Sequence, residues 1–147
     1  MKKILLANAT IINQNKEFLG SVLISGNTIE EVFVGDIPHS MNLDTIEYID
    51  CSGKHIFPGI IDDQVHFREP GLTHKGTIKS ESKAAVAGGI TSYMEMPNVI
   101  PQTTTIQNLE EKLTIAARDS YANYSFYIGA TNSNIEQLKA IDKRITC

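Results

Sequence analysis

Polar side chains alternate with apolar ones in a short stretch near the middle of the sequence. Gln64, His66 and Arg68 are separated by the apolar Val65 and Phe67. In an extended strand, neighbouring side chains point to opposite faces, so the amide, the imidazole and the guanidinium are expected on one face. An imidazole can bind a metal ion, and a guanidinium can hold a carboxylate through two parallel hydrogen bonds. The stretch therefore predicts the wall of a polar site.

Each of these side chains also has an ordinary structural interpretation. A single histidine such as His66 is more often a packed or surface residue than a metal ligand. Gln64 offers only a neutral amide oxygen, a poor ligand for zinc, and can equally hydrogen-bond within a protein interior. Arg68 can pair with a neighbouring acid, Asp63 or Glu69. The residues by themselves leave these alternatives open.

The elements around this stretch change character at about residue 56. The first part is β-rich, with expected strands at 4–6, 10–12, 21–24, 28–34 and 45–50 and a hairpin turn at 25–27. The second part alternates strands with helices, with strands at 57–67, 90–96 and 124–128 and helices at 77–87, 106–118 and 134–141. We therefore expect a small β-domain at residues 1–56 and a parallel α/β unit at residues 57–147.

Polar residues follow the second and third strands of this α/β part as well. Glu95 and Asn98 come at the end of the second strand, and Thr131 and Asn132 follow the third. Because the carboxyl ends of parallel strands form the active-site edge of such folds, these side chains are expected near the polar stretch. Periodicity alone does not separate a doubly wound sheet from a (β/α)8 barrel. The apolar pair that opens the first strand, residues 60–61, predicts a buried strand.

Two motifs in this part resemble the dihydroorotase branch of the amidohydrolase superfamily. They are DDQVHFREPG at residues 62–71 and MPN at residues 96–98. The family pattern is Asp-x-His-x-His, a hydrophobic residue and Arg-Glu-Pro-Gly, so Gln64 stands where the first metal histidine is expected. The resemblance implies an α/β fold: the start of a (β/α)8 TIM-type barrel, about three βα units, preceded by a small β-sandwich-like domain. A whole barrel needs about 250 residues, which implies the N-terminal portion of a longer enzyme.

The same resemblance implies roles for individual residues. Arg68 and Asn98 would bind the substrate. His66 would bind a metal, and Gln64 would occupy a weakened second ligand position. Asp62 would orient His66 from outside the ring of ligands. The implied cofactor is zinc, with one or two ions in the intact enzyme, and no catalytic residue is expected within the chain because the family draws those groups from later strands.

The reaction that the resemblance implies is the metal-dependent hydrolysis or formation of the cyclic amide of dihydroorotate, made from N-carbamoyl-aspartate in pyrimidine biosynthesis. A metal-held hydroxide attacks the ring carbonyl, and an acid/base group protonates the leaving nitrogen. Residues 1–147 alone are expected to be inactive. Two alternatives remain: a non-catalytic dihydroorotase-like scaffold or binding protein, which Gln64 motivates, and another cyclic amidohydrolase such as a hydantoinase or allantoinase.

Composition sets broad limits on partners and location. The 147 residues are 41% hydrophobic and carry a formal net charge of −4, with no basic run. We therefore expect a small-molecule substrate, no nucleic-acid partner and no membrane partner, with a homo-oligomer as a possible assembly. No apolar stretch approaches the roughly 18 residues of a membrane span. The N-terminal apolar run of four residues before Asn8 is too short for a signal peptide, which predicts a cytoplasmic protein. Cys51 and Cys147 do not make a disulfide framework.

Overall fold

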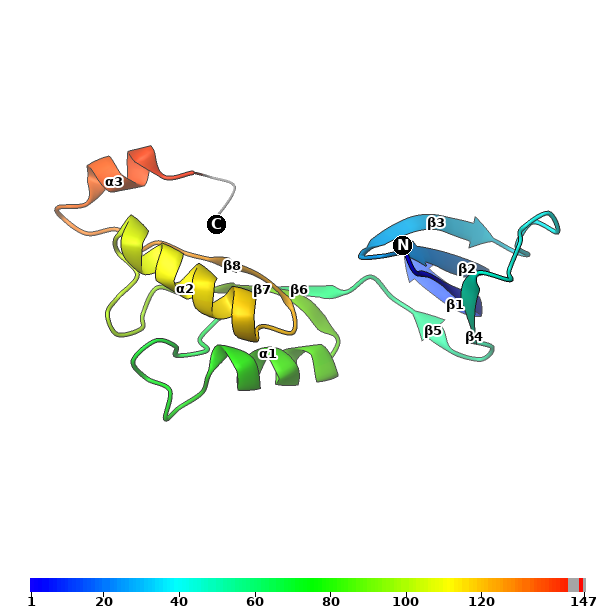
Figure 1. Cartoon of the computed structure of the whole chain (residues 1–147), viewed down its shortest axis with the longest axis horizontal. Coiled ribbons are helices and arrows are strands. Elements are labelled where there is room, and N and C mark those ends of the chain that lie inside the picture. The colour runs from blue at the N-terminus through cyan, green and yellow to red at the C-terminus, as the bar shows by residue number, and fades with distance from the viewer. Residues whose placement is uncertain (143–145, 147) are drawn as a thin grey trace. The chain divides into compact units, whose positions relative to one another are not determined.

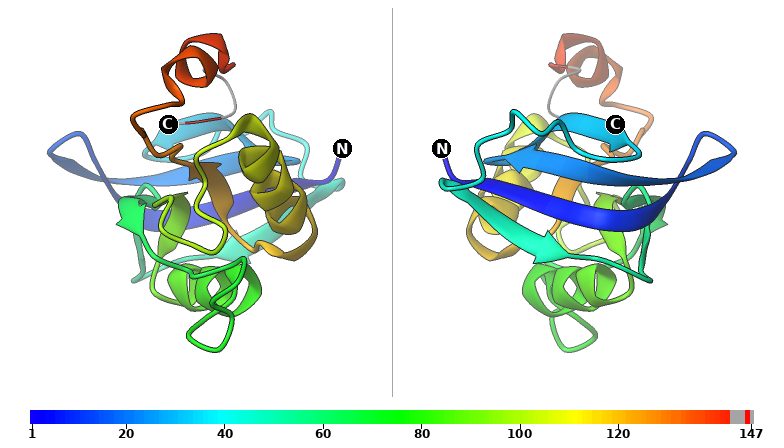
Figure 2. Two further views of the ribbon diagram at one scale, coloured as in Figure 1. Left: turned by 90° about the vertical axis from the view of Figure 1, so that its left-hand side faces the viewer. Right: turned by 90° about the vertical axis from the view of Figure 1, so that its right-hand side faces the viewer.

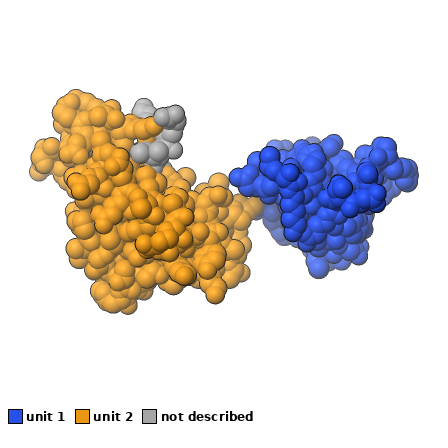
Figure 3. All heavy atoms as spheres, viewed as in Figure 1, with its two compact units in different colours: residues 1–58 blue, residues 59–147 orange. Residues whose placement is uncertain are grey.

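The computed structural model describes residues 1–142 and residue 146. The chain divides into two compact units, residues 1–58 and residues 59–147, which Figure 3 shows in different colours. The sequence places the boundary after residue 56, and the structure divides the chain after Pro58.

The first unit is a five-stranded sheet. Its strands are β1 (Lys3–Asn13), β2 (Lys16–Ser25), β3 (Thr28–Val34), β4 (Ile46–Asp50) and β5 (His55–Ile56). β1, β2 and β3 pair antiparallel, and β4 and β5 pair parallel with β1; Figure 2 shows β4 alongside β1. The described residues of this unit form one sheet, so the second layer of a sandwich stays a prediction.

Strand β1 joins two segments that the sequence predicts as separate strands. The pairing with β2 shifts register between Leu6 and Ala9. Asn8 within this irregularity has a φ of 61°, and its backbone N–H donates to Oγ of Ser21 at 3.2 Å. Asparagine tolerates this left-handed conformation better than most residues, so the bulge lets the ladder continue.

The second unit is a parallel sheet with helices packed on it. The strands are β6 (Ile60–Val65), β7 (Ile90–Glu95) and β8 (Asn123–Phe126), in the order β6-β7-β8, and the helices are α1 (Ile78–Ala87), α2 (Ile106–Asp119) and α3 (Ile135–Ala140). α1 packs on β7, α2 packs on β8, and the two helices contact each other, as Figure 1 shows. The alternation of strands and helices is therefore as the sequence predicts.

Aromatic and aliphatic side chains fill the space between this sheet and its helices. The buried members are Phe67, Ile78, Tyr93, Leu109, Ala116, Ala122 and Phe126. The rings of Phe67 and Tyr93 have centroids 4.4 Å apart, and burying one such side chain stabilises a fold by about 1.5–3 kcal/mol. This core fixes the ends of β6 and β7 against α2.

Each of the first two helices begins at a threonine cap. Oγ1 of Thr77 accepts from the N–H of Ser80, and Oγ1 of Thr105 accepts from the N–H of Asn108. Such caps satisfy backbone donors that the first helical turn leaves unpaired. Helix α1 therefore begins one residue after the predicted start, because Thr77 is its cap.

The prediction of a buried strand at residues 60–61 is wrong. Ile60 is 56% exposed and Ile61 is 62% exposed. Strand β6 is at the edge of its sheet and pairs with β7 on one side only, within the part of the chain that the structure describes. Side chains of a strand point to the two faces of the sheet, and neither Ile60 nor Ile61 packs against the core formed by the described residues, which explains the exposure.

None of the helices in the described part of the chain has the length and apolar character needed to span a bilayer.

Candidate ligand site at the ends of strands β6 and β7

The ladder of strand β6 ends at Val65, and the chain turns over the next three residues. The carbonyl of Val65 accepts from the N–H of Met96 at 3.0 Å. Val65 and Phe67 pack against the core, whereas His66 is exposed. Arg68 has a φ of 73°, which ends the extended conformation. The predicted strand is therefore shorter, but the alternation of polar and apolar side chains continues through Phe67.

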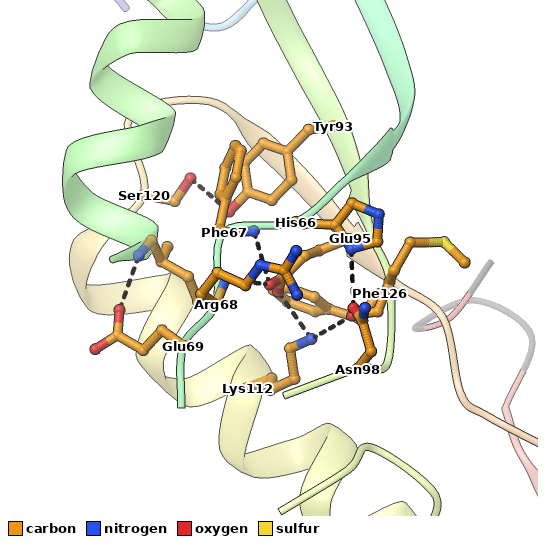
Figure 4. A network of polar contacts seen from close by, with 12 residues as sticks. His66, Phe67, Arg68, Glu69, Tyr93, Glu95, Asn98, Lys112, Ser120 and Phe126 are labelled. Carbon is orange, nitrogen blue, oxygen red and sulfur yellow. Dashed lines mark hydrogen bonds and ion pairs between the residues drawn. The ribbon is translucent and has the colours of Figure 1, made fainter. Parts of the chain in front are cut away.

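His66 contacts the side chain that follows strand β7. Its Nδ1 atom lies 2.9 Å from Oδ1 of Asn98, as Figure 4 shows. An amide oxygen only accepts hydrogen bonds, so Nδ1 carries the proton and, in the neutral imidazole, Nε2 carries the lone pair. The side-chain NH2 group of Asn98 makes no hydrogen bond to any residue that the structure describes. The pair therefore presents one acceptor and one donor group to a ligand.

The guanidinium of Arg68 has no polar partner among the described residues. It makes no hydrogen bond or ion pair with a described residue, and in Figure 4 it points in the direction of His66 and Asn98. Pairing with Glu69 does not occur, since Oε2 of Glu69 accepts from the N–H of Ile78 at 2.8 Å, at the start of α1. Arg68 is partly buried and keeps its five donors for another partner.

Glu95 lies on the helix side of the sheet, beneath the turn at residues 67–68. Its carboxylate and the ammonium of Lys112 from α2 are both fully buried, with Oε2 and Nζ 2.8 Å apart. Oε1 of Glu95 accepts from the N–H groups of Phe67 and Arg68, each at 3.1 Å. Burial raises the pKa of Glu95, and Lys112 together with the two N–H groups opposes that shift. Glu95 therefore lies near the polar stretch, as predicted, but it contacts the backbone of that stretch and not its polar side chains.

Lys112 is the residue that sequence reasoning missed. Besides Glu95, Nζ of Lys112 contacts the carbonyl oxygen of Met96 at 3.3 Å and lies 4.7 Å from the ring centroid of Phe126. The signal was present in the helix pattern, because Lys112 follows Leu109 by three residues and precedes Ala116 by four, which places it on the apolar face. A lysine on that face requires a buried acidic partner.

The remaining predicted site residues have local contacts. Oδ1 of Asp62 accepts from the N–H of Gln64 at 3.1 Å and makes no hydrogen bond to His66 within the described residues. The side chain of Gln64 is exposed. The N–H of Thr131 donates to Oδ1 of Asn134 at 2.8 Å, so the turn after β8 is stabilised internally.

The described residues do not by themselves fit a zinc ion. They contain no group of three or more His, Cys, Asp or Glu side chains placed to hold a metal. His66 offers one imidazole nitrogen and Gln64 one amide oxygen, whereas zinc sites use three or four stronger ligands. The arrangement as described suits an anion, since its free groups are the guanidinium of Arg68 and the NH2 group of Asn98.

The chain superposes on part of several solved hydantoinases. An L-hydantoinase from Arthrobacter aurescens superposes with a TM-score of 0.82 at 24% identity, covering 95% of this chain and 30% of that chain. A D-hydantoinase from Thermus sp. superposes with a TM-score of 0.72 at 28% identity, covering 93% and 30%. Residues 53–142 match the family described as dihydro-orotase-like, and the chain belongs to that family.

Curated relatives carry two different names. An allantoinase from Desulfitobacterium hafniense is 46% identical over 96 residues, which is 65% of this chain and 21% of that protein. A dihydroorotase from Ehrlichia chaffeensis is 38% identical over 133 residues, which is 86% of this chain and 29% of that protein. The chain therefore spans less than a third of the length of either relative.

Proposed function

We propose that this chain is part of a dihydroorotase, and that the turn after β6 binds the carboxylate of its substrate. The observation that supports this most directly is the free guanidinium of Arg68, which points in the direction of the His66–Asn98 pair. Dihydroorotate and N-carbamoyl-aspartate both carry a carboxylate. Arg68 can hold that group bidentately, and the NH2 group of Asn98 can donate a further hydrogen bond.

The contribution of these two residues to the reaction is orientation. Hydrolysis adds water across the ring C–N bond, so the ring carbonyl must be held at one position relative to the attacking oxygen. The carboxylate is attached to a ring carbon two bonds from the carbonyl carbon that water attacks, so holding the carboxylate also holds that carbonyl in position. Hydrogen bonds to a charged group contribute about 1.5–3 kcal/mol each, which is sufficient to position a small ligand.

A metal ion belongs to the proposal for the longer protein only. His66 offers a nitrogen to zinc at this site, because its hydrogen bond to Asn98 uses Nδ1 and leaves Nε2. Gln64 is a weak ligand. The carboxylate of Asp62 accepts a hydrogen bond from the backbone N–H of Gln64 and so stabilises the end of strand β6. The described residues do not complete a zinc site.

A second candidate function is allantoin or hydantoin hydrolysis. The 46% identity to an allantoinase over 96 residues supports it. Neither allantoin nor hydantoin carries a carboxylate, so the two candidates differ in what Arg68 would contact. The role of Arg68 therefore discriminates between them.

The test uses the longest reading frame that contains residues 1–147. The purified protein, supplied with zinc, is assayed on dihydroorotate, allantoin and hydantoin. We expect turnover of dihydroorotate, a loss of about 10- to 100-fold in kcat/KM for Arg68→Met, and little change for the exposed Lys79→Met, which also removes one positive charge. Turnover of allantoin or hydantoin that is insensitive to Arg68→Met would overturn the first candidate in favour of the second.

Residues 1–147 expressed alone provide a further check. We expect no dihydroorotate turnover from them, because the family draws its catalytic groups from later strands. Metal-dependent turnover by the purified 147-residue chain would contradict this part of the proposal.

A further inference from the structure

The turn that carries Arg68 is held by one buried carboxylate. Oε1 of Glu95 accepts from two successive backbone N–H groups, those of Phe67 and Arg68, each at 3.1 Å. Oε2 of the same carboxylate is 2.8 Å from Nζ of Lys112, and neither charged side chain is exposed to solvent. Figure 4 shows the carboxylate between the turn and helix α2. The backbone of the turn is thus attached to the helix layer through one side chain.

The conformation of this turn requires support. Arg68 has a φ of 73°, a left-handed conformation that an L-residue with a long side chain seldom adopts. Residues in such conformations persist when surrounding contacts hold them, and they cluster at ligand sites. Two N–H groups that converge on one carboxylate supply such a contact.

The contribution of the Glu95–Lys112 ion pair to stability does not by itself account for its presence. Replacing a buried ion pair by apolar residues of similar volume is often neutral or stabilising, so stability alone does not require Glu95 and Lys112. The pair lies among the apolar side chains of Phe67, Tyr93 and Phe126, where an aliphatic side chain would also pack. What an aliphatic side chain would not supply is an acceptor for the two N–H groups of the turn.

We propose that Glu95 is a positioning residue that acts through Arg68. Its carboxylate fixes the backbone turn at Phe67 and Arg68 and thereby directs the guanidinium at the carboxylate of the ligand. Lys112 holds the carboxylate of Glu95 in place. The inference rests on the proposed function, in which Arg68 binds the carboxylate of dihydroorotate.

Two double variants separate the acceptor from the ion pair. Glu95→Gln/Lys112→Met removes both charges and keeps an oxygen that can accept from the turn, whereas Glu95→Leu/Lys112→Met removes the charges and the acceptor. Single substitutions are avoided because they leave one buried charge without a partner. The two variants carry the same charge and differ in whether residue 95 offers the turn an acceptor.

The first measurement is amide hydrogen exchange at Phe67 and Arg68 in the 147-residue chain. We expect slow exchange at both amides in the wild type and in the Gln/Met variant, and faster exchange in the Leu/Met variant. Equal exchange in the two variants would overturn the proposal. If the Leu/Met variant does not fold, scalar couplings from the two wild-type amides to Cδ of Glu95 decide, with their presence supporting the proposal and their absence overturning it.

The second measurement is binding by the longest reading frame that contains the chain. Dihydroorotate is compared with dihydrouracil, which has the same ring without the carboxylate. We expect the Leu/Met variant to lose about 10-fold or more in affinity for dihydroorotate, with dihydrouracil unaffected and the Gln/Met variant close to wild type. Equal losses for both ligands would indicate a structural role and overturn the inference. A wild type that does not prefer dihydroorotate would instead overturn the proposed function, whatever the exchange data show.

Discussion

Nδ1 of His66 lies 2.9 Å from Oδ1 of Asn98, which joins the end of strand β6 to the loop after strand β7. The contact fixes the orientation and the tautomer of the imidazole, because the amide oxygen accepts a hydrogen bond from the nitrogen that carries the proton. It leaves Nε2 of His66 with a lone pair and the NH2 group of Asn98 as a donor. One hydrogen bond therefore orients an imidazole nitrogen and an amide NH2 group that make no other hydrogen bond to a described residue.

The lone pair on Nε2 of His66 predicts how a histidine at position 64 would change zinc affinity. Gln64→His places a second imidazole two residues before His66, and both side chains are exposed at the strand end. We expect zinc affinity to rise by at least about 10-fold, or about 1.4 kcal/mol, measured by competition with a zinc-binding dye. Gln107→His, at an exposed position of α2, is the matched control. Equal affinities for the two variants would show that His66 does not contribute.

The loop that follows Arg68 predicts that alanine substitutions at two glycines, Gly71 and Gly89, lower the free energy of unfolding by different amounts. Gly71 has a φ of 80°, and a Cβ atom there would lie 2.0 Å from the carbonyl oxygen of Ile100. Gly89 has a φ of 90° with nothing within 4 Å. Both alanine substitutions incur the left-handed backbone penalty of about 1–2 kcal/mol, and Gly71→Ala adds a clash with backbone. We expect Gly71→Ala to lower the free energy of unfolding by about 1–3 kcal/mol more than Gly89→Ala in urea titrations.

Similar losses for the two variants would mean that the 67–71 turn and the loop at Ile100 are not packed together. The hydrogen bond from the N–H of Ile100 to the carbonyl of Pro70, at 3.2 Å, argues that they are.

The alternation of elements could be predicted because the sequence carries it locally. Thr77 and Thr105 mark the starts of two helices, and the helical spacing of residues 106–118 marks the body of α2. The exposure of Ile60 and Ile61 could not be predicted in this way, since it depends on which elements cover the two faces of the sheet at β6. Apolar residues indicate burial only when a neighbouring strand or helix covers them.

The site could be predicted only to the level of residue types at strand ends. The sequence places His66 and Asn98 near one edge, but the hydrogen bond between them depends on the path of the loop after β7. The φ of Arg68 interrupts an alternation that otherwise predicts a continuous strand. The ion pair of Glu95 with Lys112 joins residues 17 positions apart on different elements, and only the packing of α2 on the sheet brings them together.

Asn134 predicts a local loss of stability after strand β8. Its NH2 group donates to the carbonyls of Thr104 and Gly129, each at 2.8 Å, and its Oδ1 accepts from the N–H of Thr131 at 2.8 Å. Asn134 is 4% exposed, and Asn134→Ala removes its three part-buried hydrogen bonds, which is expected to cost about 2–4 kcal/mol. Faster amide exchange at Thr131 is the measurement. Asn132→Ala, at an exposed position two residues earlier, should leave that exchange unchanged.

Tyr93 predicts a loss of stability at high pH. Burial, with smaller contributions from Glu95 and other nearby groups, raises the pKa of Tyr93 to about 12 from an ordinary value of 10.0. Between these two values the unfolded chain has already released the phenolic proton while the folded chain retains it. The folded state then binds more protons, so the free energy of unfolding falls as pH rises. At pH 11 this loss amounts to about 1.3 kcal/mol relative to pH 9.

Tyr93→Phe isolates this effect. The variant is expected to be less stable than the wild type at pH 9 by about 1 kcal/mol, because the hydroxyl of Tyr93 donates to Oγ of Ser120 at 3.2 Å. Since the variant has no proton to lose at this position, the difference should shrink to near zero by pH 11. Urea titrations at both pH values measure it, with the exposed Tyr121→Phe as the control for removing a phenol. A difference between Tyr93→Phe and wild type that stays constant from pH 9 to pH 11 would show that the phenol of Tyr93 is not shifted, and that water reaches the core between β7 and α2.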